Sequence, residues 1–266
     1  MYKTMGGRYA IPRQRKSLVT RSRLLRKLHA GIGNGLTVLH APVGFGKTTL
    51  LAAFAREISD DFNVRWLTLD ASATSPEVFA WQIAAALDGD DVAPPATADK
   101  LDDLRAYLGV VLRRVDSQHH LPVLLVIDDV HHIAESEASC ELLAWLIENL
   151  PEGAEVFLSG RAVPPLTLIN MRIATGECQV IESSDLAFSL EEIAVLLPEG
   201  SPLDAHDLLA ATDGWPAAVM ATIAGGMTLP GKGLSRTNAA WEEYLASQVW
   251  AAVPENLREP LMRIAI

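Results

Sequence analysis

Residues 41–49 read Ala-Pro-Val-Gly-Phe-Gly-Lys-Thr-Thr, and they follow the short apolar run Leu36–His40. Two glycines two residues apart allow the backbone to turn so that several N–H groups point inward. The pattern from Thr48 onward predicts a helix through about residue 58, whose positive N-terminal end would add to the same turn. A strand, a glycine turn and a helix in this order predict a phosphate-binding P-loop.

The predicted turn supplies both backbone and side-chain groups. Lys47 can reach the β- and γ-phosphates of a nucleotide, and Thr48 can offer its hydroxyl to Mg²⁺. Ala41 stands where the usual pattern has its first glycine. The nucleotide-binding residues expected from this turn are Pro42, Val43, Gly44, Phe45, Gly46, Lys47, Thr48 and Thr49.

A second apolar run, Leu124–Ile127, ends in two carboxylates, Asp128 and Asp129. Carboxylates at the end of a buried strand are costly unless a metal ion or hydrogen bonds compensate. This pattern predicts a Walker B element, in which Asp128 orders Mg²⁺ and Asp129 polarises the attacking water. Acidic residues also end strands for other reasons, so the P-loop upstream is what makes the prediction specific.

Arg161 follows a third predicted strand, Glu155–Ser159. The carboxyl ends of parallel strands line one crevice, so Arg161 would share an edge with Lys47 and could contact the γ-phosphate. The alternative is an ordinary surface arginine. His131 and His132 follow the acidic pair, and we expect a structural role for them because adjacent histidines on a helix face different ways.

Strand-like runs alternate with helical patterns up to about residue 183, which predicts an α/β fold with a parallel sheet and right-handed crossovers. The expected strands are residues 36–40, 63–69, 122–127, 155–159 and 178–181. The expected helices are residues 48–58, a segment around Trp81, residues 101–115 and residues 141–150.

The chain after residue 183 carries helical patterns instead. Ser189 and Glu192 form a capping box before an apolar run. Residues 201–202 are expected to start a second helix, which Gly214 ends, and Pro216 opens a third at a first-turn position. A further helix is expected around residues 241–250.

Composition excludes several classes of protein. The 266 residues carry a formal net charge of −11, but residues 1–56 hold 11 basic residues and no acidic one. A basic N-terminal segment in an otherwise acidic chain either binds a polyanion or surrounds a phosphate site. The overall charge and the lack of a DNA-binding motif argue against direct DNA binding. Cys140 and Cys178 are too few for a disulfide framework or a dedicated zinc site, and we expect both to be buried.

No strictly apolar run approaches the roughly 20 residues that span a bilayer, and the basic N-terminal segment lacks the apolar core of a signal peptide. We therefore expect a cytoplasmic protein with no membrane partner. A Ras-like GTPase would need a guanine-reading motif and an ABC ATPase its signature sequence, and we find neither. Lys232 is the only Lys or Arg in 185–234, which argues against a small-molecule kinase with an arginine-bearing lid.

Several segments, in order, resemble the STAND NTPases, and specifically the MalT-like subgroup of large LuxR-type bacterial transcription regulators. Residues 18–25 are similar to that group's LVxRxRLL element, and residues 41–51 to its form of the P-loop. The similarity continues through Asp-Asp-Val-His at 128–131, Ser-Gly-Arg at 159–161, the segment 188–192 and Gly-Trp-Pro at 214–216. The resemblance covers about residues 11–266.

The resemblance implies an AAA-like (ASCE) core over residues 1–183, a helical lid subdomain over 184–250 and the start of a winged helix over 251–266. It also implies that Val19 and Arg21 lie against the adenine or ribose and that Pro216 closes on the base. The residues alone leave Arg21 open as a solvated charge and Pro216 as a helix initiator. Members of this type are much longer, so the resemblance implies a nucleotide-binding module that is a fragment or a truncation.

The function expected is an ATP/ADP-binding switch with slow Mg²⁺-dependent ATP hydrolysis that serves transcription regulation. In the family, ATP promotes self-association and ADP holds the resting form. The alternative is a nucleotide-binding module without turnover in isolation. A metabolic kinase is a third, weaker reading.

Overall fold

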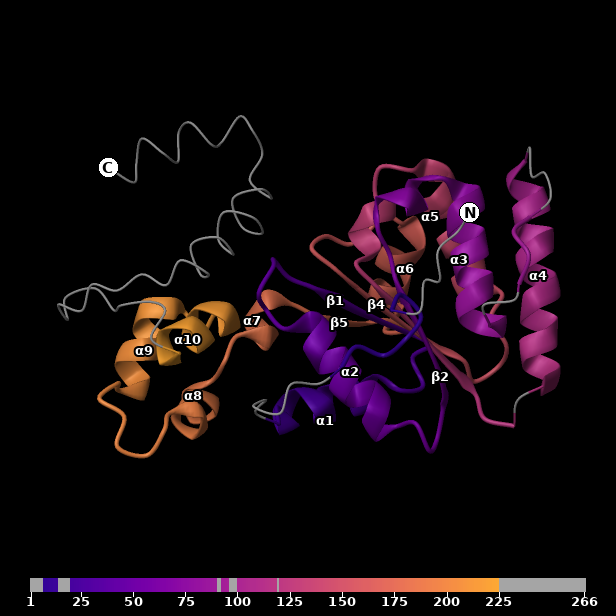
Figure 1. The fold of residues 1–266 in the computed structure, drawn as a ribbon. Helices are drawn as coiled ribbons and strands as arrows, with labels where there is room; N and C mark the ends of the chain where they lie inside the picture. The colour runs from indigo at the N-terminus through magenta and orange to yellow at the C-terminus, as the bar shows by residue number, and fades with distance from the viewer. Residues whose placement is uncertain (1–6, 14–19, 90–91, 96–99, 119, 225–266) are drawn as a thin grey trace, which may run out of the picture. The chain divides into compact units, whose positions relative to one another are not determined.

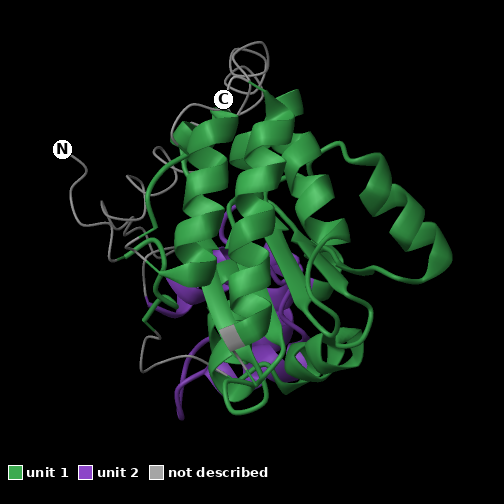
Figure 2. Cartoon of the chain, turned by 90° about the vertical axis from the view of Figure 1, so that its right-hand side faces the viewer, with its two compact units in different colours: residues 1–42, 47–185 green, residues 43–46, 186–266 purple. Residues whose placement is uncertain are grey.

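The computed structural model describes residues 7–13, 20–89, 92–95, 100–118 and 120–224. These residues form two compact units, shown in different colours in Figure 2. The first unit contains the described residues up to 42 and residues 47–185, and the second contains residues 43–46 and the chain from residue 186 onward. The expected helix around residues 241–250 and the expected winged-helix segment lie outside the described residues.

The first unit is built on a parallel five-stranded sheet with the order β2-β3-β4-β1-β5 (Figure 1). Each neighbouring pair is parallel, which confirms the predicted α/β class. The strands agree with the predicted ones to within one or two residues at each end. They are β1 (Leu36–His40), β2 (Asn63–Thr68), β3 (Val123–Asp128), β4 (Glu155–Gly160) and β5 (Gln179–Ile181).

The helices of this unit are α1 (Ser22–Gly31), α2 (Lys47–Glu57), α3 (Pro76–Asp88), α4 (Leu101–Gln118), α5 (Glu137–Glu148), α6 (Thr167–Thr175) and the single turn α7 (Ser183–Leu186). Helices α2 to α6 connect successive strands of this unit, whereas α1 precedes β1 and α7 follows β5. Two short 3₁₀ segments, η1 (Ala71–Thr74) and η2 (Val130–Ile133), follow β2 and β3. Among these described helices, none is long and apolar enough to cross a membrane.

Strand alternation divides the sheet residues between two apolar layers. Val156 and Leu158 of β4 join the large cluster that includes buried side chains of α3, α4 and α5. Phe157, between them, stacks on Phe54 of α2 with the ring centroids 5.4 Å apart. Helices on both layers explain why β3 and β4 are buried at every position.

The helix predictions for the first unit need correction, because one start was misplaced and α1, α6 and α7 were not predicted. Helix α5 begins at Glu137 rather than Glu141, because the Ser136 hydroxyl accepts the Ser139 N–H and caps it four residues earlier. Helix α6 was not predicted from the sequence. Its N-cap position is held by Leu166, which makes no side-chain cap hydrogen bond, so the usual start signal is missing.

The second unit contains α8 (Leu190–Leu196), α9 (Ala205–Thr212) and α10 (Pro216–Ile223), packed around Phe188, Ile193, Leu208 and Val219. The predicted capping box of α8 is confirmed: Ser189 and Glu192 exchange side-chain-to-backbone hydrogen bonds of 3.2 and 3.0 Å. The prediction that α9 starts at residues 201–202 is wrong. Asp204 caps this helix instead, because its carboxylate accepts the N–H groups of His206 and Asp207.

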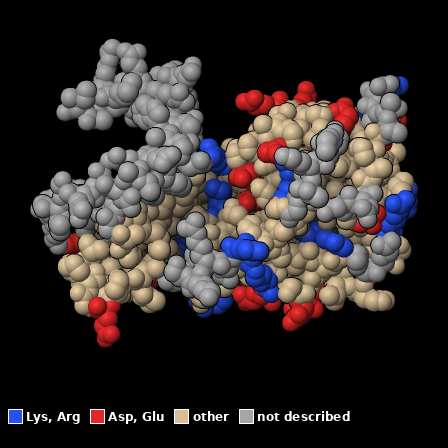
Figure 3. All heavy atoms as spheres, in the orientation of Figure 1, with Lys and Arg blue, Asp and Glu red and all other residues tan. Residues whose placement is uncertain are grey.

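Part of the basic excess of the N-terminal segment is neutralised within the first unit. Arg8 pairs with Asp70, and Lys27 pairs with Asp185 at 2.6 Å. Arg56 donates to the Pro12 carbonyl. The basic N-terminal segment, for which the sequence suggested a polyanion or a phosphate site, therefore also pairs with acidic residues of the same unit. Lys and Arg are accordingly interspersed with Asp and Glu over the visible face in Figure 3.

Candidate nucleotide-binding site

The sheet order brings the strand that ends in Asp128 and the strand that leads into the P-loop to either side of β4. β4 pairs with β1 on one side and with β3 on the other, so it separates the strand before the P-loop from the strand that carries Asp128. Because all these strands are parallel, their carboxyl ends meet at one edge. The residues at that edge are His40 of β1, Asp128 of β3 and Gly160 of β4.

Lys47 is the first residue of α2, and its ammonium group is turned back along the P-loop. Its Nζ donates to the carbonyls of Ala41 at 2.7 Å and Pro42 at 3.0 Å. The side chain is buried, and burial lowers the pKa of Lys47. The nearby charges of Asp128 and Asp129 oppose this shift, and Arg161 adds to it. A buried cation that donates to two carbonyl groups can exchange them for phosphate oxygens.

Asp128 is the central acidic group of the site. It is 1% exposed at the end of β3, and burial raises its pKa. Two hydroxyls donate to its carboxylate: Thr48 to Oδ2 at 2.7 Å and Ser159 of β4 to Oδ1. These hydrogen bonds lower the pKa against the effect of burial. A carboxylate and a hydroxyl in contact form an oxygen donor set of the kind that Mg²⁺ prefers, so these residues fit that ion.

Asp129 follows in a left-handed backbone conformation, with φ at 58°. That conformation is uncommon outside glycine and is favoured by Asp and Asn. Its side chain is 41% exposed, and Oδ1 lies 3.7 Å from Nδ1 of His131. The turn therefore holds one carboxylate buried, on Asp128, and presents the next one to solvent. That exposure is what a water-positioning group requires.

The sequence suggested that the two histidines after this turn face different ways, and the structure contradicts this. They lie in η2, a 3₁₀ segment, and their rings stack with centroids 4.4 Å apart. Burial lowers the pKa of His131 to about 4, with further contributions from His132, Arg161 and Lys47. His131 is therefore a neutral group beside the cations of the site.

Arg161 is exposed and immediately follows β4. Its charge contributes to the lowered pKa of both Lys47 and His131, so it lies within electrostatic range of the predicted site. In the first unit the structure thus gathers Lys47, Thr48, Asp128, Asp129 and Arg161.

Known proteins resemble this chain over much of its length. Residues 31–162 match the family model of an AAA domain. The serine/threonine-protein kinase PknK of Mycobacterium tuberculosis is 32% identical over 267 residues, which cover 92% of this chain and 23% of PknK. The transcriptional regulator MalT of Serratia proteamaculans is 33% identical over 224 residues, covering 78% of this chain and 24% of MalT. The chain spans about a quarter of the length of these relatives.

The chain carries an AAA-type P-loop domain of the MalT-like class. Among solved structures, the Aeropyrum pernix ORC1 protein in complex with DNA has the same fold, with a TM-score of 0.53 and 16% identity. That match covers 95% of this chain and 72% of the ORC1 chain. The homology supports a nucleotide-binding regulatory module.

The residues that the resemblance assigned to the base remain predictions for this MalT-like domain. Val19 lies outside the described residues. Arg21 is half-buried at the N-cap of α1. Pro216 is buried at the first position of α10, where its ring suits helix initiation. The remaining P-loop residues, Val43–Gly46, belong to the second unit.

Sequence reasoning missed two residues that contact the predicted site residues. Ser159 was read only as the end of a strand, although its hydroxyl binds Asp128. Trp215 was read only as part of a motif, although its indole N–H donates to the Val43 carbonyl at 3.2 Å. The contact of Ser159 with Asp128 could have been predicted only if the pairing of β4 with β3 had been known. The Trp215 contact joins positions 172 apart and had no local signal.

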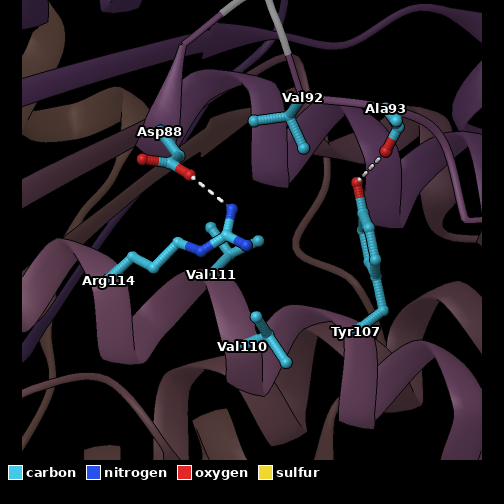
Figure 4. Close-up of a pocket in the computed structure, with 7 residues that line it drawn as sticks. All are labelled: Asp88, Val92, Ala93, Tyr107, Val110, Val111 and Arg114. Atoms are coloured by element: carbon cyan, nitrogen blue, oxygen red, sulfur yellow. Dashed lines mark hydrogen bonds and ion pairs between the residues drawn. The ribbon is translucent and has the colours of Figure 1, made fainter.

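The MalT-like domain also has a cavity of about 450 Å³ between α3 and α4, apart from the predicted nucleotide site (Figure 4). An Asp88–Arg114 ion pair of 3.5 Å spans it, and Tyr107 closes one side by donating to the Ala93 carbonyl. Its charged groups are already paired with each other. None of the sequence-predicted site residues lines it.

Proposed function

We propose that this chain is an ATP/ADP-binding switch module of a signal-transduction ATPase that regulates transcription, with slow Mg²⁺-dependent ATP hydrolysis. The observation that carries the proposal is the 2.7 Å hydrogen bond from Thr48 to Asp128. It joins the first turn of α2 to the end of β3, two elements far apart in the sequence. A hydroxyl and a carboxylate that meet beside a buried lysine are the parts of a nucleotide-phosphate site.

Each group has a distinct role in the proposed reaction. Lys47 binds the β- and γ-phosphate oxygens, and the N–H groups of the P-loop cradle the phosphates. Asp129 orients the attacking water, and Arg161 contacts the γ-phosphate. Thr48 and Asp128 would hold Mg²⁺, which would supply positive charge to stabilise the phosphates.

The proposal extends to parts of the chain that only the resemblance supports. Val19 and Arg21 would contact the adenine or ribose, and Pro216 would close on the base from a helical lid over residues 184–250. The γ-phosphate contacts would decide the position of this lid. MalT is named as a transcriptional regulator. The resemblance to that group supports a cytoplasmic location and, in a full-length context, ATP-dependent self-association. We propose no direct DNA or membrane contact for this chain.

The alternative is nucleotide binding without turnover. It is favoured by one observation: the chain spans only about a quarter of the length of its relatives. Groups supplied by the rest of a longer protein would then be needed for hydrolysis. Both proposals include the phosphate site, and they differ only in whether water attacks the γ-phosphate of bound ATP.

A single-turnover measurement separates the two readings. Phosphate release from ATP is followed with excess protein and Mg²⁺ for the parent, Asp129→Asn and the exposed control Asp61→Asn. We expect release by the parent and the control, and release about 100-fold slower or more for Asp129→Asn, because a water-positioning base is lost. ADP affinity should be equal in all three. A parent that binds ATP and releases no phosphate would establish the alternative, and one that binds neither nucleotide would refute both.

A further inference from the structure

Part of the P-loop is bonded to the start of α10. Residues 43–46 and α10 belong to the same compact unit (Figure 2). The indole N–H of Trp215 donates to the Val43 carbonyl at 3.2 Å, and the backbone N–H of Ala217 donates to the Gly44 carbonyl at 3.1 Å. We call these two hydrogen bonds, with the four residues that make them, the α10 clasp.

The clasp is also a close steric fit. A Cβ atom added to Gly44 would lie 2.7 Å from the Ala217 Cβ and 2.8 Å from the Trp215 Nε1. Gly44 has φ at +84°, a conformation that side chains rarely adopt. Gly46 has a similar φ of +77°, but within the described part of the chain a Cβ added there meets nothing within 4 Å. Gly44 is therefore constrained by its contact with α10 as well as by the turn.

Trp215 is itself held in place by the chain around it. Its backbone N–H donates to Thr212 at 2.9 Å, and its carbonyl accepts the Val219 N–H at 3.0 Å. The preceding Gly214 has φ at +71° and accepts the Phe188 N–H at 2.8 Å. Pro216 has no N–H, so Ala217 carries the first backbone N–H donor of the helix. The Gly44 carbonyl accepts this hydrogen bond. These bonds hold the backbone that carries both donors of the clasp.

Fixing these two carbonyls also fixes two N–H groups. The peptide bonds of the described residues are trans, and in a planar trans peptide the C=O and N–H point in opposite directions. The Val43 carbonyl shares its peptide with the Gly44 N–H, and the Gly44 carbonyl shares its peptide with the Phe45 N–H. Holding the carbonyls toward α10 therefore turns both N–H groups to the other side of the turn. Successive N–H groups on one side form an anion-binding concavity.

We propose that Trp215 is a positioning residue for phosphate, which acts by holding the Val43 carbonyl so that P-loop N–H groups point at the pyrophosphate portion of a nucleotide. The inference rests on the proposed nucleotide function and adds a residue that touches the loop from behind. A phosphate oxygen on an N–H polarises the peptide and makes its carbonyl a better acceptor. Phosphate binding therefore tightens the clasp, and the clasp strengthens phosphate binding to the same extent.

The test compares Trp215→Phe with Trp81→Phe. Trp81 makes the same kind of bond, from its indole N–H to the Val92 carbonyl at 2.9 Å, on α3 of the first unit. Calorimetric titrations with inorganic pyrophosphate, ADP and adenosine are run on the parent and both variants. One net hydrogen bond corresponds to an affinity change of roughly 3- to 10-fold. Because this bond also forms without phosphate, that factor is the upper limit for Trp215→Phe. We expect Trp215→Phe to lose affinity within this limit, equally for pyrophosphate and ADP, and Trp81→Phe to match the parent.

Three results would overturn the inference while leaving the proposed function intact. They are equal affinities for the parent and Trp215→Phe, a loss with ADP but not with pyrophosphate, and an equal loss in Trp81→Phe. A parent that binds neither pyrophosphate nor ADP would refute the proposed function as well. If Trp215→Phe does not fold, hydrogen exchange of the indole N–H groups in the parent decides. Pyrophosphate should slow exchange of the Trp215 group, and unchanged exchange would contradict the clasp.

Discussion

The carboxylate of Asp128 shows how single residues set the chemistry of this site. It is buried at a strand end, where an unpaired charge would be costly. Hydroxyls from two other elements, Thr48 on α2 and Ser159 on β4, offset that cost. Sequence could predict Asp128 and Thr48, because each belongs to a local motif. It could not predict Ser159, because its role depends on β4 lying beside β3 in the sheet.

His131 gives a residue-scale prediction about pH. Because burial and nearby cations lower the pKa of this imidazole to about 4, it is neutral in the folded protein at pH 6 and protonated in the unfolded chain. Its contribution to the free energy of unfolding is present above pH 6.5 and is lost as the pH falls toward 4. An NMR titration of the ring, assigned with His131→Gln, should give a midpoint near 4. A midpoint near 6.5 would show that the group is not buried among cations.

At the scale of elements, sequence predicted those with strong local signals. The buried strands β3 and β4 have continuous apolar runs, and α8 has a capping box. Helix α6 has no capping side chain and was missed. The start of α9 was placed at a serine-proline pair, whereas the capping carboxylate stands two residues further on. A capping side chain helps to predict a helix, but it fixes the start only when the sequence offers no competing start signal nearby.

The turn between β1 and α2 gives a matched pair of glycine substitutions. Gly44→Ala and Gly46→Ala both place a side chain at positive φ, which costs about 1–2 kcal/mol. Only Gly44→Ala also brings a Cβ into contact with Ala217 and Trp215. Thermal unfolding without nucleotide should therefore show Gly44→Ala to be clearly less stable than Gly46→Ala. Equal stabilities would mean that the loop does not lie against α10 in solution.

At the scale of the whole molecule, the structure changes how the uneven charge distribution is interpreted. The basic N-terminal segment suggested a polyanion or phosphate partner, yet Arg8 and Lys27 pair with Asp70 and Asp185. Composition alone could not show this, because pairing depends on which distant residues meet. The order of motifs along the chain did predict the class, and residues 31–162 match the AAA domain. Residues from 225 onward, where a lid helix and winged helix were expected, lie outside the described part.

The central claim is that Lys47 and the groups around it bind the phosphates of a nucleotide. Equilibrium titration with MgATP and MgADP tests it most directly, on the parent, Lys47→Ala and the exposed-lysine control Lys100→Ala. A charge-assisted hydrogen bond to phosphate is worth about 1.5–3 kcal/mol, so Lys47→Ala should lose roughly 10- to 100-fold in affinity. Lys100→Ala should bind as the parent does. Binding of both nucleotides by Lys47→Ala with the affinity of the parent would contradict the account.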